Sequence, residues 1–398
     1  DDTYYIIRIR IHPENPDILY VAATGYHYSN NTQRGVFKST DGGKTWKKSL
    51  AVTDGKDPIG MADLVMHPNN PEILYASAWD RDGGEKSGVY KTTDGGANWT
   101  EVSNGLPTGN IGKIGLDIYL RDPEVLYAVG IGIGRTDDSR GENAVFRTSN
   151  GGGSWERVSP EGVNIKGSSR YGQIRIDPND GNHVYVMSTG VQTTDDGGKT
   201  WYRGIRFGGD NQAMWINPDN SEHMILGYDY GMAVSHSGGE TWYHPDNLPC
   251  GLFYAISYDM DFPYNVYGGT QDFGSWKGPS TKRGRFPIRM EDWQHVRGAD
   301  GAYVQVDPTD SRWLYVESQN GSISRNDQKT SVRKGLQYRK EGIRYNFISP
   351  ILISPHNHNV VFHAANVLLK SSYRGEDWQE ISPDLTNYEE VMLSLIHI

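Results

Sequence analysis

Short segments in which apolar and polar residues alternate return many times along the chain. In the first, Ile7, Ile9 and Ile11 alternate with Arg8 and Arg10, and a period of two is typical of a β-strand. A turn rich in proline, asparagine and aspartate follows, and then a second apolar segment that usually ends in an aromatic residue. Each copy therefore predicts two antiparallel strands joined by a tight turn.

Copies of this strand pair recur at intervals of 40 to 58 residues. The eight second segments end at Tyr20, Tyr75, Tyr127, Tyr185, Ile225, Tyr267, Tyr315 and Phe362. Self-similarity at this spacing indicates a repeat architecture.

A second motif follows inside most copies and combines a strand, a turn with glycines and a tryptophan. Its members are GVFKSTDGGKTW at 35–46, GVYKTTDGGANW at 88–99, AVFRTSNGGGSW at 144–155, VQTTDDGGKTW at 191–201, MAVSHSGGETW at 232–242 and LLKSSYRGEDW at 368–378. Serine, threonine and aspartate side chains can bond to turn amides, and glycine permits a positive φ. The tryptophan opens the next strand, and we expect it to be largely buried between neighbouring units.

Each unit thus holds four short strands, which predicts an all-β β-propeller with eight four-stranded antiparallel blades. A parallel β-helix is the alternative, but its rungs are shorter than these units. The blades are expected at about 1–52, 57–104, 108–160, 168–206, 209–249, 251–297, 300–340 and 343–388.

The glycine-turn motif carries a family resemblance. Ser39, Asp41, Gly43, Thr45 and Trp46 fit the pattern S-x-D-x-G-x-T-W, which is the Asp-box or bacterial neuraminidase repeat. Residues 1–388 resemble Asp-box β-propellers of the sortilin type and, more distantly, xyloglucanase-like glycosyl hydrolases. The most family-specific segments are YGGTQDFGSW at 267–276, RGADGAYVQVDP at 297–308, ESQNGSISR at 317–325 and SPDLT at 382–386. The resemblance implies a ten-bladed ring, of which eight blades are present here, and an extracytoplasmic bacterial protein.

The Asp-box residues are expected to be structural. Asn150 and Ser237 replace the aspartate in two copies, so the motif does not require a carboxylate. We assign a structural role to Asp41, Trp46, Asp94, Trp99, Asn150, Trp155, Asp196, Trp201 and Trp242.

The composition limits the classes of molecule that this protein is expected to bind. The 398 residues hold 39 Lys and Arg against 49 Asp and Glu, a net charge of −10, so nucleic acid is not an expected partner. No apolar stretch reaches the 18 residues of a membrane-spanning helix. The single cysteine, Cys250, excludes an internal disulfide, and no motif predicts a metal or a cofactor.

Both ends of the sequence look cut. The chain begins with Asp1 rather than Met, so any signal peptide would precede it. LSLIHI at 393–398 is interpreted as the translation of a sequencing adapter, and the alternative is an authentic apolar tail. We therefore expect further blades or C-terminal domains of a longer protein as partners of this chain.

Topology predicts where a ligand would bind. In a propeller, the loops between strands two and three share one face with the loops that enter the next blade, and the Asp-box turns lie on the opposite face. Asp210, Asp272 and Asp300 fall on such loops and are the candidate catalytic residues. The candidate ligand-binding residues are Asp229, Trp276, Tyr303, Glu317 and Arg344, with Trp276 and Tyr303 as stacking surfaces.

Three functions remain open. The leading one is binding of a peptide or glycan on the channel face. The alternative is glycoside hydrolysis by a carboxylate pair about 5–5.5 Å apart for retention or about 6.5–9.5 Å apart for inversion. In xyloglucanases, as the resemblance implies, two tandem propellers share the cleft, so a lone propeller would be inactive. The third is a structural or assembly scaffold in which these residues only shape turns. Sialidase chemistry is disfavoured, because Arg285-Phe286-Pro287 matches its arginine motif poorly.

Overall fold

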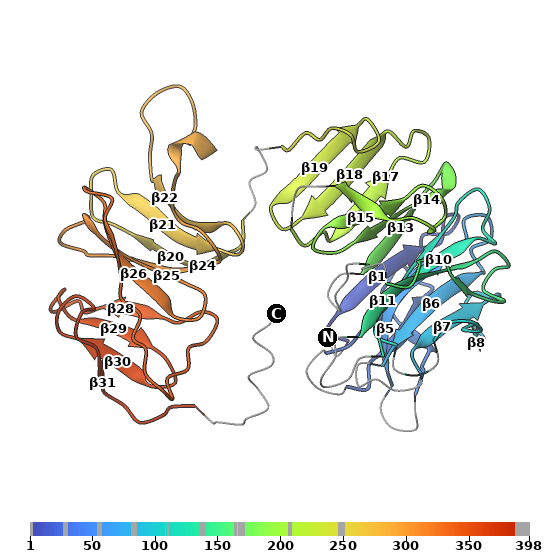
Figure 1. Cartoon of the computed structure of the whole chain (residues 1–398), viewed down its shortest axis with the longest axis horizontal. Coiled ribbons are helices and arrows are strands. Elements are labelled where there is room, and N and C mark those ends of the chain that lie inside the picture. The colour runs from blue at the N-terminus through green and yellow to red at the C-terminus, as the bar shows by residue number, and fades with distance from the viewer. Residues whose placement is uncertain are drawn as a thin grey trace. The chain divides into compact units, whose positions relative to one another are not determined.

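The computed structural model describes residues 3–26, 31–53, 58–80, 86–107, 109, 111–134, 141–162, 165, 172–205, 209–245 and 251–386. Cys250 and residues 393–398 lie outside this part of the chain. Two compact units make up the chain, Asp1–Pro245 and Asp246–Ile398, and both consist of antiparallel sheets (Figure 1). That the eight blades of residues 1–388 belong to one ten-bladed ring stays a prediction.

The first unit contains five blades, each a meander of consecutive strands. Their strands are β1 (Ile6–Ile11), β2 (Leu19–Ala23), β3 (Gly35–Ser39) and β4 (Lys47–Leu50); β5 (Gly60–Met66), β6 (Leu74–Trp79), β7 (Gly88–Thr92) and β8 (Thr100–Glu101); β9 (Ile114–Ile118), β10 (Leu126–Ile133), β11 (Glu142–Thr148) and β12 (Glu156–Arg157); β13 (Gln173–Asp177), β14 (Asp180–Met187), β15 (Val191–Thr194) and β16 (Tyr202–Ile205); β17 (Ala213–Ile216), β18 (His223–Tyr228) and β19 (Gly231–His236). In the fifth blade the fourth strand is reduced to a single bridge between Val234 and Tyr243.

The second unit contains three four-stranded blades. Their strands are β20 (Phe253–Tyr258), β21 (Asn265–Thr270), β22 (Gly274–Pro279) and β23 (Gln294–Arg297); β24 (Gly301–Val306), β25 (Trp313–Ser318), β26 (Ser322–Asp327) and β27 (Arg333–Gly335); β28 (Ile351–Ile353), β29 (Val361–Ala364), β30 (Leu368–Ser371) and β31 (Gln379–Glu380). A short 3₁₀ helix, Met290–Asp292, lies in the long connection that replaces the Asp-box of blade six. The prediction of an all-β propeller with eight blades is confirmed.

Buried tyrosines connect blade one to blade two and blade two to blade three. The Tyr20 hydroxyl donates to the carbonyl of Gly95 (2.9 Å), in the Asp-box turn of blade two, and Tyr75 donates to Gly151 in blade three (3.1 Å). Lys38 pairs with Tyr20 across the sheet, lies 5.2 Å from the centre of its ring and donates to the same Gly95 carbonyl. A fully buried hydroxyl without a partner would be costly, so this contact fixes the position of one blade on the next.

The Asp-box tryptophans pack backwards, on the preceding blade. Trp155 is buried with residues of blade two and donates to the Val102 carbonyl (2.8 Å), whereas Trp99, Trp201 and Trp242 are half-buried in the equivalent clusters. Trp46 is 40% exposed, because no described blade precedes blade one. The expectation that all five tryptophans are largely buried is therefore wrong for Trp46, and only Trp155 is fully enclosed.

Hydrogen bonds close the Asp-box turn. The Asp41 carboxylate accepts from the Ser39 hydroxyl (2.8 Å) and from the Thr45 amide (2.9 Å). Asn150 occupies the same place in blade three and accepts from the Ser154 amide at 2.9 Å. In blade eight, Asp377 closes the turn instead, because its carboxylate accepts a hydrogen bond from the amide of Tyr373 (2.8 Å).

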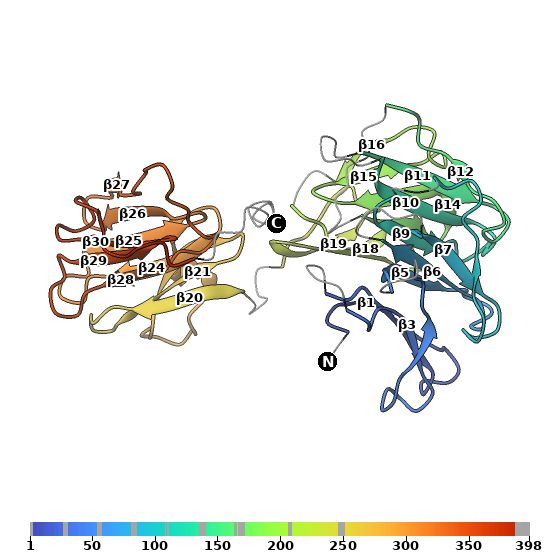
Figure 2. The ribbon, with the colours of Figure 1, turned by 90° about the horizontal axis from the view of Figure 1, so that it is seen from below.

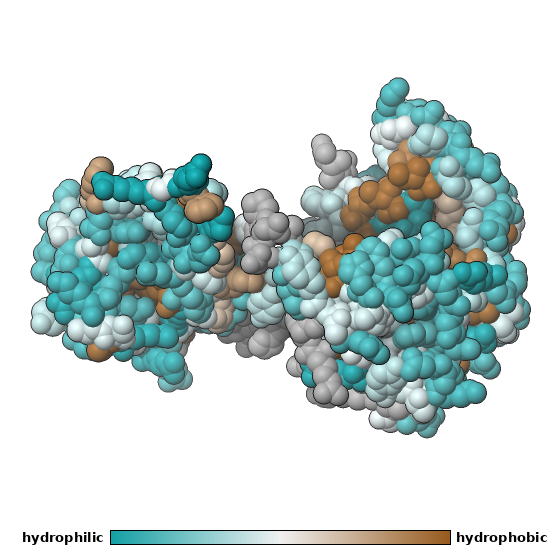
Figure 3. All heavy atoms as spheres, turned by 90° about the horizontal axis from the view of Figure 1, so that it is seen from above, coloured by the Kyte–Doolittle hydropathy of each residue, from teal (hydrophilic) through white to brown (hydrophobic). Residues whose placement is uncertain are grey.

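Exposed apolar side chains concentrate where a blade lacks a neighbour within its unit. Ile9 and Ile11 on β1 are 54% and 56% exposed, and Ile256 and Tyr258 on β20 are 71% and 67% exposed. Within its own unit, the first blade has no preceding blade against this face. In the space-filling view, apolar areas interrupt a largely hydrophilic surface (Figure 3).

Replacing tryptophans by alanine tests whether the buried Trp155 contributes more to stability than the partly exposed Trp46. We expect Trp155→Ala to lower the free energy of unfolding by ~3–5 kcal/mol, as a large-to-small change in a core does. Trp46→Ala should cost about 1 kcal/mol or less, because its ring is partly in solvent. Urea denaturation followed by far-UV circular dichroism measures the free energy of unfolding of both variants. Equal decreases in the two variants would contradict this difference in burial.

Acid titration tests the Asp-box turns. Hydrogen bonds, chiefly from Thr45 and Asn98, lower the pKa of both Asp41 and Asp94 to about 2. A lowered folded pKa gives stability that is complete above about pH 5 and is lost as the pH falls through about 2. The double variant Asp41→Asn, Asp94→Asn should melt close to the wild type at pH 7, since Asn150 makes the same amide contact, and should lose less stability between pH 5 and 2.5. Parallel pH profiles of the melting temperature would argue against this role.

Candidate functional site

Two of the three candidate catalytic aspartates meet at one end of the second unit. Asp272 lies in the turn between β21 and β22, and Asp300 lies in the loop that enters β24. The amide of Asp272 donates to Oδ1 of Asp300 at 2.8 Å. Asp272 has φ +59° and Ala299 has φ +68°, a region that non-glycine residues rarely adopt, so the bond holds two tight turns together.

The contacts continue along the same rim into the next two blades. Gln319, in the turn between β25 and β26, donates its side-chain amide to Oδ2 of Asp300. The amide of Asn320 donates to the carbonyl of Phe347 (3.0 Å), in the segment that enters β28. We call Asp272, Asp300, Gln319, Asn320 and Phe347 the acidic rim. It lies at the ends of the blades opposite the Asp-box turns, as the topology predicts.

An aromatic pair joins the acidic rim at Phe347. Tyr254 on β20 and Phe347 have ring centres 6.5 Å apart at an angle of 79°. Burial, and then the negative charges of Asp300 and Asp272, raise the pKa of Tyr254. Sequence reasoning missed this pair, because Tyr254 lies in an irregular first strand with a bulge.

Trp276 and Tyr303, the predicted stacking residues, are engaged in packing. Trp276 lies on the third strand of blade six, donates its indole N–H to the Phe273 carbonyl (2.7 Å) and meets His295 edge-on at 5.0 Å. Tyr303 is half-buried against the core cluster of blades seven and eight. Their roles in ligand binding stay predictions.

Glu317 is fully buried between blades seven and eight. Its carboxyl oxygens accept from the amides of Ser349 (3.0 Å) and Tyr303 (3.4 Å). Burial raises the pKa of Glu317 to about 8 despite these bonds and the nearby Arg297. Arg297 instead donates to the carbonyls of Val316 (2.8 Å) and Ser322 (2.6 Å). The Glu317 carboxyl group therefore supports the backbone below the rim rather than facing a ligand.

Arg344 ties the end of blade eight to its beginning. It pairs with Asp384 at 2.7 Å and donates to the Thr386 hydroxyl at 2.9 Å. Asn366 donates to the same Asp384 carboxylate (2.8 Å). The SPDLT segment is thus anchored by these two residues.

Asp210 and Asp229 belong to the first unit. Asp210 has φ +48°, and the amide of Asp229 donates to the carbonyl of Gly209 (3.2 Å). The two aspartates are therefore close in the first unit, and grouping them with Asp272 and Asp300 stays a prediction.

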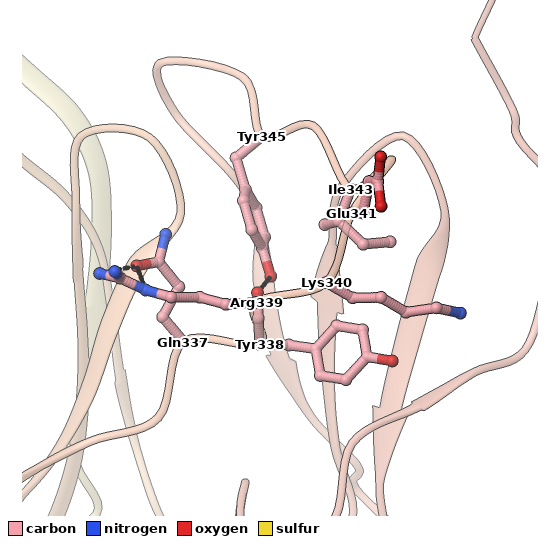
Figure 4. Close-up of a pocket in the computed structure, with 7 residues that line it drawn as sticks. All are labelled: Gln337, Tyr338, Arg339, Lys340, Glu341, Ile343 and Tyr345. Atoms are coloured by element: carbon pink, nitrogen blue, oxygen red, sulfur yellow. Dashed lines mark hydrogen bonds between the residues drawn. The ribbon is translucent and has the colours of Figure 1, made fainter.

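A hollow of about 450 Å³ lies next to the acidic rim. Figure 4 shows Tyr338 and Tyr345 in it, with Arg339, Lys340 and Glu341 on the surrounding loop. The Tyr345 hydroxyl donates to the Tyr338 carbonyl (2.9 Å). Gln337 joins the hollow to the rim, because its side-chain amide donates to the Asn320 carbonyl (2.9 Å).

The described part of the chain contains neither a group of side chains suited to a metal ion nor a helix suited to crossing a membrane. There, no three His, Cys, Asp or Glu side chains are grouped so that they could hold a metal ion. No described helix has the length and apolarity to cross a bilayer.

Fold and repeats together define a β-propeller with Asp-box repeats. Residues 37–48 match the family model of the BNR/Asp-box repeat. A crystal structure of a GH74 enzyme from Niastella koreensis aligns with 94% of this chain and 71% of its own length, with a TM-score of 0.52 and 14% identity. At this identity the likeness concerns the fold alone.

Curated relatives match parts of the chain. A xyloglucanase of Paenibacillus sp is 26% identical over 232 residues, which are 51% of this chain and 21% of that protein. An oligoxyloglucan-reducing end-specific xyloglucanase of Emericella nidulans is 29% identical over 159 residues, 39% of this chain and 18% of that protein. Vacuolar protein sorting/targeting protein 10 of Fusarium vanettenii is 29% identical over 99 residues, 25% of this chain and 6% of that protein, which supports the sortilin-type resemblance only loosely. The chain spans about a fifth of the length of these xyloglucanases.

The pH dependence of stability tests the burial of Glu317. A raised folded pKa means that unfolded Glu317 ionises first, so stability is complete below about pH 4.5 and falls as the pH rises towards 8. Glu317→Gln should therefore melt at a higher temperature than the wild type at pH 7.5 and at the same temperature at pH 4. Glu380→Gln is the control and should show no gain at pH 7.5, because Lys340 lowers the pKa of Glu380. A wild-type advantage at pH 7.5 would contradict the assignment for Glu317.

Proposed function

We propose that this chain is the ligand-binding part of an extracytoplasmic β-propeller protein, and that the acidic rim of its second unit binds a glycan. The observation that carries the proposal is the contact between Asp272 and Asp300 beside the aromatic pair Tyr254 and Phe347. Carboxylates accept hydrogen bonds from sugar hydroxyls, and aromatic rings give the apolar surface that ligand sites require.

The chemical class of the glycan follows from the relatives. Two of the matching proteins are named as enzymes of xyloglucan or its oligosaccharides, so a plant-type β-glucan is the first ligand to test. The adjacent hollow, with its tyrosines and charged side chains, offers a second contact for a chain-like ligand. A peptide is the remaining ligand class for the same rim.

Glycoside hydrolysis is the second candidate function, and the xyloglucanase relatives favour it. It would use Asp272 and Asp300, one as acid and one as base or nucleophile. Both Asp300 oxygens already accept hydrogen bonds from the protein, which suits a positioning role better than proton transfer. Binding therefore stands ahead of hydrolysis.

Calorimetric titration with xyloglucan oligosaccharides, cello-oligosaccharides and a peptide library tests the proposal. Tyr254→Ala should weaken glycan binding at least tenfold, while Tyr254→Phe, which keeps the ring, should bind nearly as well as the wild type. Asp272→Asn should also weaken binding, because an amide accepts hydrogen bonds less strongly than a carboxylate.

Tyr373→Ala is the matched control, because this exposed tyrosine lies in the Asp-box turn of blade eight, at the opposite ends of the strands. It should bind as the wild type does. Equal affinity of Tyr254→Ala and the wild type, with unchanged melting temperatures, would overturn the rim as the site. Release of reducing sugar that Asp272→Asn abolishes would favour hydrolysis over simple binding.

A further inference from the structure

Charged side chains gather on the first strands of blades one to four, in the first unit and apart from the acidic rim. These strands, β1, β5, β9 and β13, follow one another on the inner side of the arc of five blades, whereas β8 lies on its outer side (Figures 1 and 2). The group comprises Arg8, Arg10, Asp63, Lys113, Asp117 and Arg175.

Both carboxylates are engaged with the next blade. Asp63 pairs with Arg8 (2.7 Å from Nε) and accepts from the amide of Leu116 (3.2 Å). Asp117 accepts from the amide of Ile176 at 2.9 Å. Each acid therefore covers the open edge of a neighbouring first strand, where the backbone has no partner within its own sheet.

The positive charges exceed the negative ones. Four cations stand against two carboxylates, an excess of two charges in a chain whose net charge is −10. Arg175 is held by the Ile174 carbonyl (2.6 Å) and the Gln173 side chain (3.1 Å). Lys113 is buried, and burial lowers its pKa to about 8. Most of these charges are therefore present at pH 7.

Arg10 is the cation of this group for which the described residues provide no carboxylate partner. Among the described residues no acidic group lies within 4 Å of its guanidinium, and the only hydrogen bond that it makes to them is a 3.4 Å contact to the Ile9 carbonyl. Burial, and then the charge of Arg8, lower the pKa of Arg10, although the charges of Asp63 and Asp117 oppose this shift. A half-buried guanidinium that lies two residues from Arg8 on the same strand is stabilised when an anion binds, because its planar donors match the two oxygens of a carboxylate or phosphate.

We propose that Arg10 and Arg175 form a binding site for an oxyanion, either a carboxylate as in an acidic sugar or a phosphate. The site is independent of the acidic rim and uses different residues. Its ligand would bind to the inner strands of the first unit, with Arg8 held in place by Asp63.

Thermal melting and calorimetric titration at constant ionic strength test the site, with sodium glucuronate, inorganic phosphate and sodium chloride as probes. We expect the wild type to melt at a higher temperature in glucuronate or phosphate than in chloride. Arg10→Gln should weaken binding at least tenfold, and Arg10→Lys should keep part of it, because lysine retains the charge but not the paired donors. Stronger binding of glucuronate would identify an acidic sugar, and stronger binding of phosphate would identify a phosphorylated ligand.

Lys47→Gln is the charge-matched control, because Lys47 is exposed on the fourth strand of blade one, and it should bind as the wild type does. Should Arg10→Gln not fold, Arg175→Gln replaces it. Equal effects of all three salts, or equal losses in Lys47→Gln and Arg10→Gln, would overturn the proposal. Tyr254→Ala should leave glucuronate and phosphate binding intact, so failure at the acidic rim and failure at this site are distinguishable.

Discussion

Polar side chains of each blade find their partners on the backbone of the next blade, and the rest of the structure depends on this arrangement. Tyr20 donates to Gly95, Thr24 donates to the Met61 carbonyl (2.7 Å), and Ser77 donates to the Ile114 carbonyl (2.7 Å). Each group is buried, and a buried polar group without a partner costs more than a hydrogen bond gains. These hydrogen bonds therefore fix the position of each blade on its neighbour. The positions of the rim loops depend on how the blades are placed in this way.

The sequence predicts the blades because their signals are local. Tyrosine-ended strands and glycine turns depend on residues a few positions apart, and each copy repeats the evidence. The exposure of Trp46 was not predictable in this way, since it depends on whether a preceding blade covers the ring. Asp377 was missed for a similar reason: it closes its turn from the far end, where the motif has no acidic position.

The candidate site was predictable only in part. Topology places Asp272 and Asp300 on one rim, and they meet there. Strand direction alone does not say which way a side chain points, so Glu317 was predicted to bind a ligand, whereas its carboxyl group is buried and accepts a hydrogen bond from the Ser349 amide. Tyr254 was missed because a bulge in its strand interrupts the alternation of faces. Arg10 was recognised only as the polar half of a strand pattern, since its lack of a carboxylate partner depends on three other blades.

The contact between successive blades is directional: in blade two, the Tyr75 hydroxyl donates to the Gly151 carbonyl of blade three, whereas the Trp99 indole donates to the Ser49 hydroxyl of blade one. One repeat therefore encodes both halves of the interface. A duplicated repeat, inserted in frame, would bring a matching front and back with it, and the chain could gain or lose whole blades without new compensating substitutions. The unequal repeats, with intervals from 40 to 58 residues, fit a history in which copies multiplied first and their loops diverged afterwards.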